Sequence, residues 1–415
     1  MVLTSGTVIA QLVSYVAVPF ITRLYSPDEI GQLGVFLRIT ALITAVASAR
    51  YELSLPLPKK DAHAFQLFRL SLRISAITLL VCLGLGFIYW AYKDFEVYWL
   101  VVIVTLLLSS FFLAFKNIGT NWAVRTKKFR LISLSGMFGS LTTNSLKIGA
   151  GLFGYGVVGL FISTLIGAVV GALFFIRNYF QKARLNSNKR SRPKMKVLSK
   201  NYRDLPFVSL PQMLIDHGRE LLIAFFIVFF FDQTIFGSYD HSFRMLKLPL
   251  VLIGMSMGQV FLNRISTMYA NEQAIFPTLK KLTITLFFIS IIPFAVIFMF
   301  GGEIFAFVFG EEWYFSGKIA SIISPWLMLN FVASPISVIP MVIEKLKTFF
   351  WIGLIGTLLQ LIGFGLLPFF FAKEEQGLTF ILWTVTIALS VYTILYIYSI
   401  LYFTKKSDVS IQNLS

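Results

Sequence analysis

The chain is nearly free of cysteine and poor in histidine. Cys82 is the single cysteine and lies in an apolar run, which leaves no disulfide framework and no cysteine-based metal site. The three histidines, His63, His217 and His241, show no HExxH or other metal-ligand spacing. The sequence therefore predicts neither a disulfide-stapled domain nor a metal centre, and no cofactor is expected.

Motifs for covalent catalysis and nucleotide binding are also missing. The sequence contains no GxSxG elbow, no Walker A loop and no DxD-like acidic pair. We therefore do not expect an enzyme, nor a pump that uses ATP directly. A membrane enzyme of glycan assembly stays an alternative, although its usual extracytoplasmic catalytic loop has no counterpart among the short connections of this chain.

Charge is scarce and apolar residues are abundant. Among the 415 residues 57% are hydrophobic and 13% are charged, phenylalanine occupies 44 positions, and the mean hydropathy is +0.79. A soluble domain cannot bury that much apolar surface, whereas a helix that crosses a bilayer needs about 20 mostly apolar residues. The composition predicts an all-α polytopic membrane protein.

Apolar runs separated by charge, proline or glycine predict the spans. We expect twelve transmembrane helices, and the first is a retained span rather than a signal peptide. The predicted spans are residues 2–22, 30–49, 72–92, 96–115, 131–154, 157–176, 206–231, 236–262, 282–301, 317–339, 348–371 and 379–403.

The basic residues alternate between the two sets of connections. One set carries 27 lysines and arginines and the opposite set carries four. Because basic loops stay on the cytoplasmic side during insertion, the pattern places both termini in the cytoplasm, and we expect an inner-membrane protein. Membrane orientation thus accounts for the formal charge of +17, and no nucleic-acid partner is expected.

The longest connection divides the chain into halves. Residues 177–204 are polar and basic, follow the sixth span, and are expected to rest on anionic lipid headgroups. The predicted organisation is an N-terminal six-helix lobe at 1–176, this linker, a C-terminal six-helix lobe at 205–403 and a cytoplasmic tail at 404–415.

The halves share a short repeat. Gly31-Gln-Leu-Gly-Val-Phe-Leu-Arg38 in the second span and Gly237-Ser-Tyr-Asp-His-Ser-Phe-Arg244 in the eighth place glycine and arginine at the same spacing, 206 residues apart. Duplicated units are common in transporters, and six spans per copy keep both copies in one orientation. We expect two lobes related by a pseudo-two-fold axis along the membrane normal.

Arginine inside a span costs at least about 2.5 to 3.5 kcal/mol on insertion scales, so Arg38 and Arg244 must face protein, water or an anion. Helical spacing adds Lys247 to the face of Arg244 and places Lys147 on a polar face of the fifth span. Excess positive charge predicts an anionic ligand, and guanidinium groups bind phosphate oxygens bidentately.

The candidate coupling groups lie in the seventh and eighth spans. Asp216 and Glu220 flank Arg219 and are expected to pair with it inside the membrane. Asp240 precedes His241, which could carry a coupling proton, although a structural histidine is the more common case.

Two elements near the N-terminus resemble a known family. The TRLYSP-x-E-x-G element and the RYE-x-x-x-x-LP-K element, within residues 22–59, resemble the polysaccharide repeat-unit (O-antigen) flippases of the multidrug/oligosaccharidyl-lipid/polysaccharide exporter superfamily. The segments GSYDHSFRMLKLPLVLIG at 237–254 and FVFGEEWYFSG at 307–317 are similar in style.

The resemblance implies a two-lobed bundle around a central cationic cavity that opens alternately to each side. It implies transfer of an undecaprenyl-pyrophosphate-linked oligosaccharide for O-antigen or capsule synthesis, with Arg38, Arg244 and Lys247 as binding residues and Arg50 and Lys147 as weaker candidates. Implied partners are the lipid-linked oligosaccharide, membrane lipids, and polysaccharide polymerase and chain-length proteins. A cation-coupled multidrug exporter and a peptidoglycan lipid-precursor flippase are the alternatives. Drug exporters of the superfamily use acidic cation sites in their first lobe, whereas spans one to six of this sequence contain no acid beyond Glu96 at the edge of the fourth.

Overall fold

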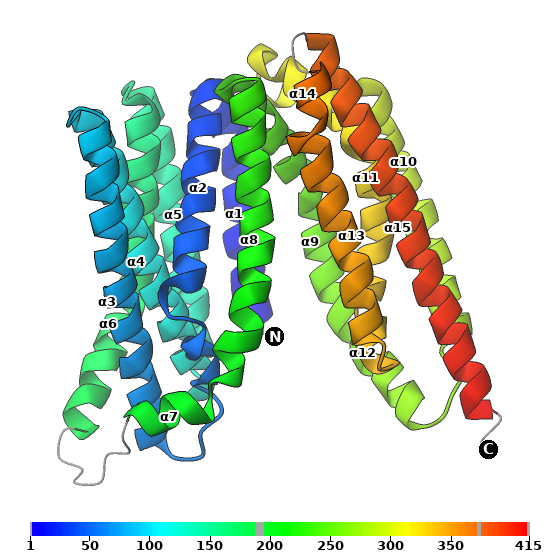
Figure 1. Ribbon diagram of the computed structural model, residues 1–415, viewed down its shortest axis with the longest axis horizontal. Helices are drawn as coiled ribbons and strands as arrows, with labels where there is room; N and C mark the ends of the chain where they lie inside the picture. Colours follow the sequence, from blue (N-terminus) through cyan, green and yellow to red (C-terminus); the bar gives the residue numbers. More distant parts are fainter. Residues whose placement is uncertain (1, 187–194, 372–374, 413–415) are drawn as a thin grey trace. The chain divides into compact units, whose positions relative to one another are not determined.

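The computed structural model describes residues 2–186, 195–371 and 375–412, and this part of the chain is built from helices (Figure 1). Twelve helices there have 20 or more residues: α1 (Val2–Thr22), α2 (Pro27–Ala47), α3 (Asp61–Tyr92), α4 (Val97–Arg125), α5 (Phe129–Leu152), α6 (Gly156–Asn186), α8 (Asp204–Phe230), α9 (Gln233–Ala270), α10 (Phe276–Phe309), α11 (Tyr314–Ile336), α13 (Leu346–Gly365) and α15 (Glu375–Gln412). The short elements are η1 (Tyr51–Ser54), α7 (Met195–Asn201), η2 (Glu311–Trp313), α12 (Ile339–Val342) and α14 (Leu367–Phe371).

The twelve long helices confirm the twelve predicted spans one for one. Within the described residues, eight helical segments are long and apolar enough to cross a membrane by length and composition. The helices α5 and α8 are not among these eight, and they carry Lys147 and the Asp216, Arg219 and Glu220 cluster respectively. The protein is therefore a multi-pass membrane protein in which polar residues are concentrated on particular helices.

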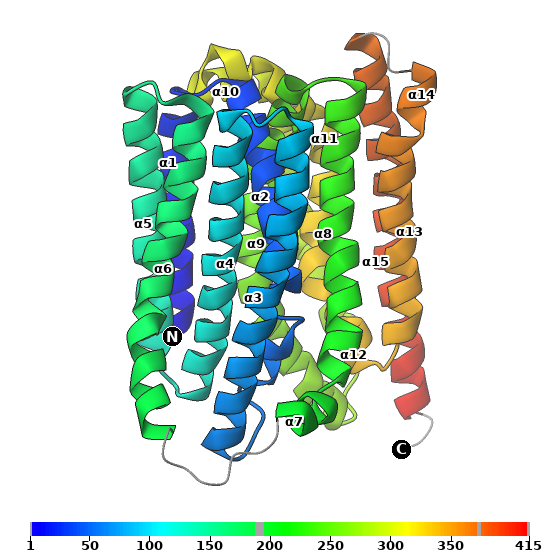
Figure 2. The same ribbon diagram turned by 60° about the vertical axis from the view of Figure 1, so that its left-hand side comes forward.

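The chain forms two compact units, Met1–Leu222 and Ile223–Ser415, so that the boundary lies within α8. In the first unit α4 packs against α2, α3 and α6, and α5 packs against α1 and α6. Figure 2 shows these helices side by side, with the short helix α7 lying across one end of them. α7 falls within the predicted linker.

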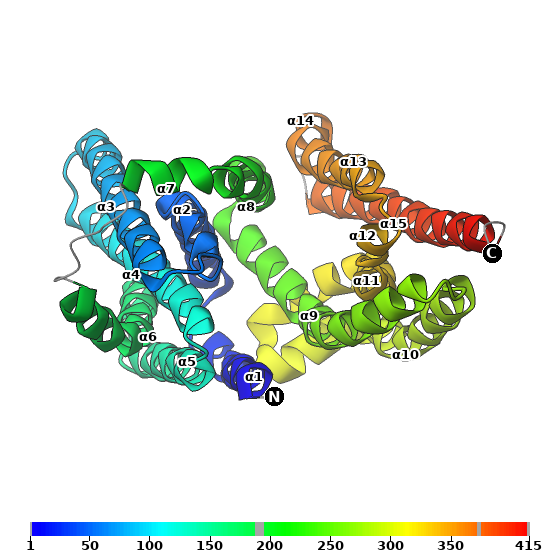
Figure 3. The ribbon, with the colours of Figure 1, turned by 90° about the horizontal axis from the view of Figure 1, so that it is seen from below.

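In the second unit α11 is the central helix. It packs against α9, α10 and α15, and α13 packs against α15 (Figure 3). We number the long helices of each half from one to six, with α1 first in one half and α8 first in the other. Four packed pairs then recur in both halves. They are helix two with four, three with four, four with six, and five with six. This shared packing order supports the duplication that the glycine and arginine repeat predicts.

The helix α3 begins 11 residues before the predicted third span because its first turns are buried against protein. Phe65 and Phe68 lie edge-on to Trp122 of α4, with ring centroids 6.2 and 5.7 Å apart. Leu198 of α7 joins the same cluster, and the Tyr51 hydroxyl donates a hydrogen bond to the Ser199 carbonyl at 3.1 Å. Part of the linker is thereby fastened to the first unit.

The start of α2 is set by local hydrogen bonds. The Ser26 hydroxyl accepts from the Glu29 amide while the Glu29 carboxylate accepts from the Ser26 amide, which is a capping box, and Pro27 occupies the first turn. These residues belong to the TRLYSP-x-E-x-G element, so this part of the family-like pattern specifies where a helix begins.

The helices α10 and α11 approach closely through Gly301 and Gly317. A Cβ atom on Gly317 would lie 2.1 Å from the Gly301 carbonyl oxygen, so no larger residue fits without moving a helix. Gly310, between the two helices, has φ 113°, in the region that favours glycine. Small residues of this kind are the usual means by which membrane helices pack tightly.

Candidate functional site

Arg38 and Arg244 occupy equivalent positions in their helices. Each is the twelfth residue of its helix, Arg38 in α2 and Arg244 in α9. At the rise of an α-helix this is about 16 Å from the helix start. The spacing that relates the two arginines in sequence is therefore preserved as position along equivalent helices.

Arg244 forms an ion pair with Asp240, one turn earlier in α9. The Asp240 side chain is 4% exposed and the Arg244 side chain is 39% exposed. The carboxylate is therefore compensated inside the unit, while part of the guanidinium stays accessible. Asp240 is the ion-pair partner of Arg244, and this makes it less suitable as a separate group for coupling transport to an ion gradient.

Lys247 follows on the same side of α9 and is exposed. Its Nζ lies 5.2 Å from the centroid of the Phe243 ring, a cation–π distance. Phe243 in turn stacks on Trp326 of α11, with centroids 5.9 Å apart. In the second unit the structure thus brings Asp240, Arg244 and Lys247 onto one helix face, with two cations for one carboxylate.

Arg38 has a different local environment. Its Nη1 donates a hydrogen bond to the Gly34 carbonyl at 3.2 Å, and the side chain is half-buried. Gly34 is the residue that corresponds to Asp240 in the repeat, so the carboxylate on which Arg244 is anchored has no equivalent at this position.

Arg50 is engaged by an acid that our sequence analysis did not single out. Its Nη1 lies 3.2 Å from Oε1 of Glu52, which is 3% exposed and also accepts a hydrogen bond from the Ser48 hydroxyl. Arg50 adopts a left-handed conformation with φ 62° just after α2. This pair favours a structural role for Arg50. The pair could have been predicted from the sequence, because Arg50 and Glu52 are only two residues apart in the RYE motif.

Lys147 lies close to the end of α5 and is 9% exposed. Its carbonyl accepts a hydrogen bond of 2.8 Å from the Tyr25 hydroxyl. Burial, with a smaller contribution from Glu29, raises the pKa of Tyr25 to about 12, so this hydroxyl remains a donor at neutral pH. The TRLYSP element is thereby anchored to the fifth helix.

Asp216 and Glu220 both lie on α8, where Asp216 is exposed and Glu220 is half-buried. Arg219 is half-buried between them, and its Nε has no hydrogen-bond partner among the described residues. The ion pair expected between Arg219 and these acids stays a prediction, and so does the proposed part of Asp216 and Glu220 in coupling.

His241 is buried among aromatic rings. Its ring centroid lies 4.5 Å from that of Phe309, 4.4 Å from that of Trp313 and 5.7 Å from that of Phe305. The imidazole Nε2 has no hydrogen-bond partner among the described residues. These contacts join the two C-terminal segments of the family resemblance, at 237–254 and 307–317. They favour a packing role for His241, and its coupling role stays a prediction.

Serine side chains also connect these segments. The Ser242 hydroxyl lies 2.8 Å from the Ser316 hydroxyl, and Ser316 donates to the Ser238 carbonyl at 2.9 Å. In the first unit Ser14 of α1 and Ser140 of α5 are joined in the same way, with their hydroxyl oxygens 2.7 Å apart. Small polar residues on these helices therefore hold neighbouring helices together.

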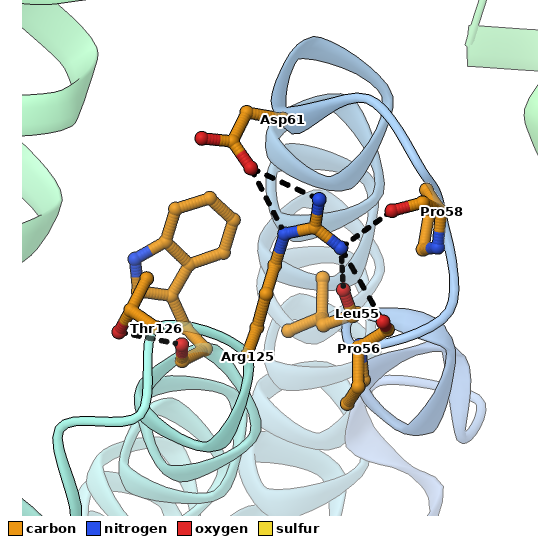
Figure 4. A network of polar contacts seen from close by, with 7 residues as sticks. Leu55, Pro56, Pro58, Asp61, Arg125 and Thr126 are labelled. Atoms are coloured by element: carbon orange, nitrogen blue, oxygen red, sulfur yellow. Dashed lines mark hydrogen bonds and ion pairs between the residues drawn. The ribbon is translucent and has the colours of Figure 1, made fainter.

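Arg125, at the end of α4, organises the RYE-x-x-x-x-LP-K element (Figure 4). Its Nη1 donates to the carbonyls of Leu55 and Pro58 at 3.2 and 2.7 Å, and its Nη2 lies 2.9 Å from Asp61 Oδ1. The side chain is 10% exposed. One guanidinium thus closes the loop between α2 and α3. The RYE-x-x-x-x-LP-K element, one of the two motifs of the family resemblance, therefore has a structural role.

Lys116 is another charged group that the sequence analysis placed outside the spans. It lies inside α4, and a Cβ atom on Gly171 of α6 would be 3.3 Å from its Cδ. No hydrogen bond or ion pair of its side chain occurs within the described residues. The predicted fourth span ended one residue too early to include it.

Comparisons with known proteins agree with this architecture. The chain is similar to an inward-facing multidrug resistance MATE family transporter of the MOP superfamily, with 16% identity, a TM-score of 0.72, and coverage of 99% of this chain and 96% of that one. It is similar to the lipid II flippase MurJ in an inward closed conformation, with 18% identity, a TM-score of 0.69, and coverage of 98% and 89%. A MOP superfamily transporter from Pyrococcus furiosus shares 15% identity and a TM-score of 0.57 over 99% and 95%.

No relative among curated proteins matches the sequence. Residues 20–316 match the family described as polysaccharide biosynthesis protein, and this range contains both N-terminal elements and both repeat arginines. The chain therefore belongs to the polysaccharide biosynthesis protein family and has the fold of the MOP superfamily transporters.

Proposed function

We propose that the protein is a flippase that moves undecaprenyl-pyrophosphate-linked oligosaccharide repeat units across the bacterial inner membrane for surface polysaccharide synthesis. The observation that carries the proposal is the pair of arginines, Arg38 and Arg244, at the same position of equivalent helices in a member of a polysaccharide biosynthesis family. The cytoplasmic placement of both termini, and the polymerase and chain-length proteins as partners, belong to the same proposal.

The charges match this substrate class. Arg38 in the first unit, and Arg244 and Lys247 in the second, carry positive charge, whereas a pyrophosphate diester carries negative charge. Guanidinium groups bind phosphate oxygens through two parallel hydrogen bonds, which a lysine ammonium cannot reproduce. Cations within a predicted span are costly to retain, which favours a role in binding a ligand.

A transport assay tests the proposal. Full-length protein in liposomes should transfer lipid-linked repeat units, prepared from the strain that carries the gene, to the opposite leaflet, where an added glycosidase can reach them. Arg38→Ala and Arg244→Ala should each abolish transfer when equal amounts of folded protein are reconstituted, and Arg→Lys should retain part of it. Arg264→Ala, at an exposed position farther along α9, is the matched control and should transfer normally.

The same variants separate this proposal from its alternatives. A repeat-unit flippase leaves lipid-linked glycan on the inner leaflet when its gene is deleted, and the arginine variants should fail to complement that deletion. If the doubly substituted Arg38→Ala, Arg244→Ala protein complements fully, the anion role is wrong. Sensitivity of the deletion strain to organic cations would favour the multidrug exporter, and transfer of peptidoglycan precursor alone would favour the precursor flippase.

A further inference from the structure

The second unit contains a groove beside Lys247 that our sequence analysis did not identify. It has a volume of about 680 Å³ and is lined by residues of α9, α11, α13 and α15, and of the segment that follows α11, all within Ile223–Ser415. Figure 3 shows α11 between α9 and α15, the helices that border the groove. This volume lies in the range of small-molecule sites, about 300 to 1,000 Å³.

Two polar atoms in the groove, the Tyr396 hydroxyl and the Asn330 side-chain oxygen, have no hydrogen-bond partner among the described residues. Asn330 uses its amide nitrogen on the Trp326 carbonyl at 3.1 Å, which leaves its side-chain oxygen as an acceptor. Unsatisfied groups at membrane depth cost several kcal/mol each in hydrocarbon. Lipid tails are therefore poor occupants, whereas a ligand with hydroxyl groups satisfies both donors and acceptors.

Aromatic rings border the same space. Tyr396 lies edge-on to Phe349, with centroids 5.5 Å apart, and Tyr392 is 6.2 Å from Tyr396. Tyr392 is packed against Gly356, where a Cβ atom would lie 2.7 Å from its Cε1. The rings are thus held in place by neighbours, so their faces and edges form a preformed wall. Hydroxyl, amide and ring groups together suit a pyranose, which has polar edges and apolar faces.

We infer that this groove binds sugar residues of the transported glycan, with Lys247 at its rim next to the pyrophosphate. The inference rests on the proposed function and extends it to the saccharide. In a lipid-linked repeat unit the pyrophosphate is bonded directly to the first sugar. A phosphate held by Lys247 therefore places that sugar at the entrance of the groove, where Asn330 and Tyr396 can hydrogen-bond to it.

Gly353 allows the groove to be filled without disturbing its walls. It lines the groove on α13, and a Cβ atom built on it meets no other atom within 4 Å. Gly353→Phe should therefore fold and occupy the sugar site. Gly84→Phe is the matched control, because Gly84 of α3 is exposed, has the same open surroundings and lies outside the groove.

The test measures binding and transfer separately. The first probe is the water-soluble oligosaccharide released from the lipid-linked repeat unit by mild acid, and the second is inorganic pyrophosphate. Calorimetry on full-length protein in detergent should show oligosaccharide binding that Gly353→Phe weakens at least tenfold and Tyr396→Phe weakens several-fold. Pyrophosphate binding should stay within twofold in both variants, and Gly84→Phe should bind both probes normally.

The outcomes distinguish the two claims. Equal oligosaccharide affinity in wild type and Gly353→Phe, or no oligosaccharide binding to wild type, overturns the sugar site even if liposome transfer proceeds. Undecaprenyl phosphate, added as a third probe, tests for a lipid groove: loss of its binding in Gly353→Phe, with oligosaccharide binding intact, overturns the sugar site. Failure of wild-type transfer, with oligosaccharide binding that depends on Gly353, rejects the flippase while the sugar site stands.

Discussion

Asp240 and Arg244 form an ion pair across one turn of α9, in which the carboxylate is buried and the guanidinium is partly accessible. Removing the arginine leaves a buried charge without compensation, which is more costly than the pair itself contributes. We expect Arg244→Ala to destabilise the protein by about 2 kcal/mol, because partial exposure reduces the full penalty of a buried pair. The loss of stability is measured from thermal unfolding in detergent, with size-exclusion chromatography used to monitor the folded fraction.

The double variant Asp240→Asn, Arg244→Ala separates stability from transport. It should recover most of the lost stability, because the carboxylate is replaced by a neutral amide, yet it should still fail to transfer lipid-linked glycan. Recovery of both properties would mean that Arg244 matters only as the partner of Asp240.

Arg125 provides a prediction about the loop between α2 and α3. Arg125→Ala removes a charged donor from the Leu55 and Pro58 carbonyls and from Asp61. One hydrogen bond to a charged group contributes about 1.5 to 3 kcal/mol, and water replaces part of what partly exposed partners such as Asp61 lose, so a stability loss of about 2 to 3 kcal/mol is expected. Transport per folded molecule should be unchanged. Arg264→Ala serves as control, and an equal loss of stability there would contradict the assigned role.

Two glycines one turn apart in α13 should respond in opposite ways. Gly353→Ala adds a methyl group in open space and improves helix propensity, so stability should rise by up to about 1 kcal/mol. Gly356→Ala places a Cβ atom 2.7 Å from the Tyr392 ring and should cost about 1 to 3 kcal/mol. Parallel melting curves of the two variants decide this, and destabilisation by Gly353→Ala would show that the groove is not open.

His241 offers a test of proton coupling. Because three aromatic rings surround the imidazole, Phe should fit in its place with a stability change below about 1 kcal/mol. We expect His241→Phe to retain transport with the same dependence on an imposed pH gradient. A gradient-dependent wild type beside a gradient-independent variant would instead assign the coupling proton to His241.

Most of the helices were predictable because they are long apolar runs, whose positions follow from residue-by-residue hydropathy. The least accurate starts were those of α3 and α10, where polar residues continue a helix beyond the apolar stretch. Phe65 and Phe68 show why: a helix outside the bilayer is stabilised by contacts with Trp122, which the local sequence does not contain.

Within the candidate site, contacts between residues close in sequence could be predicted, whereas contacts between residues far apart in sequence could not. The ion pair of Asp240 with Arg244 follows from helical spacing, and the pair of Arg50 with Glu52 could have been found in the same way. The bond from Tyr25 to Lys147 crosses 122 residues, and the groove depends on four helices at once. Neither leaves a periodic signal in the sequence.

The hydrogen bonds of Arg125 to the loop after α2 also imply an order of events during synthesis. Pro58 is synthesised 67 residues before Arg125, which donates to its carbonyl. Tyr51 is synthesised 148 residues before Ser199, whose carbonyl accepts its hydrogen bond. The second helix is therefore synthesised before the loop that follows it can be completed. Arg125 at the end of the fourth helix holds this loop, and the bond from Tyr51 to Ser199 forms only after most of the linker has been made.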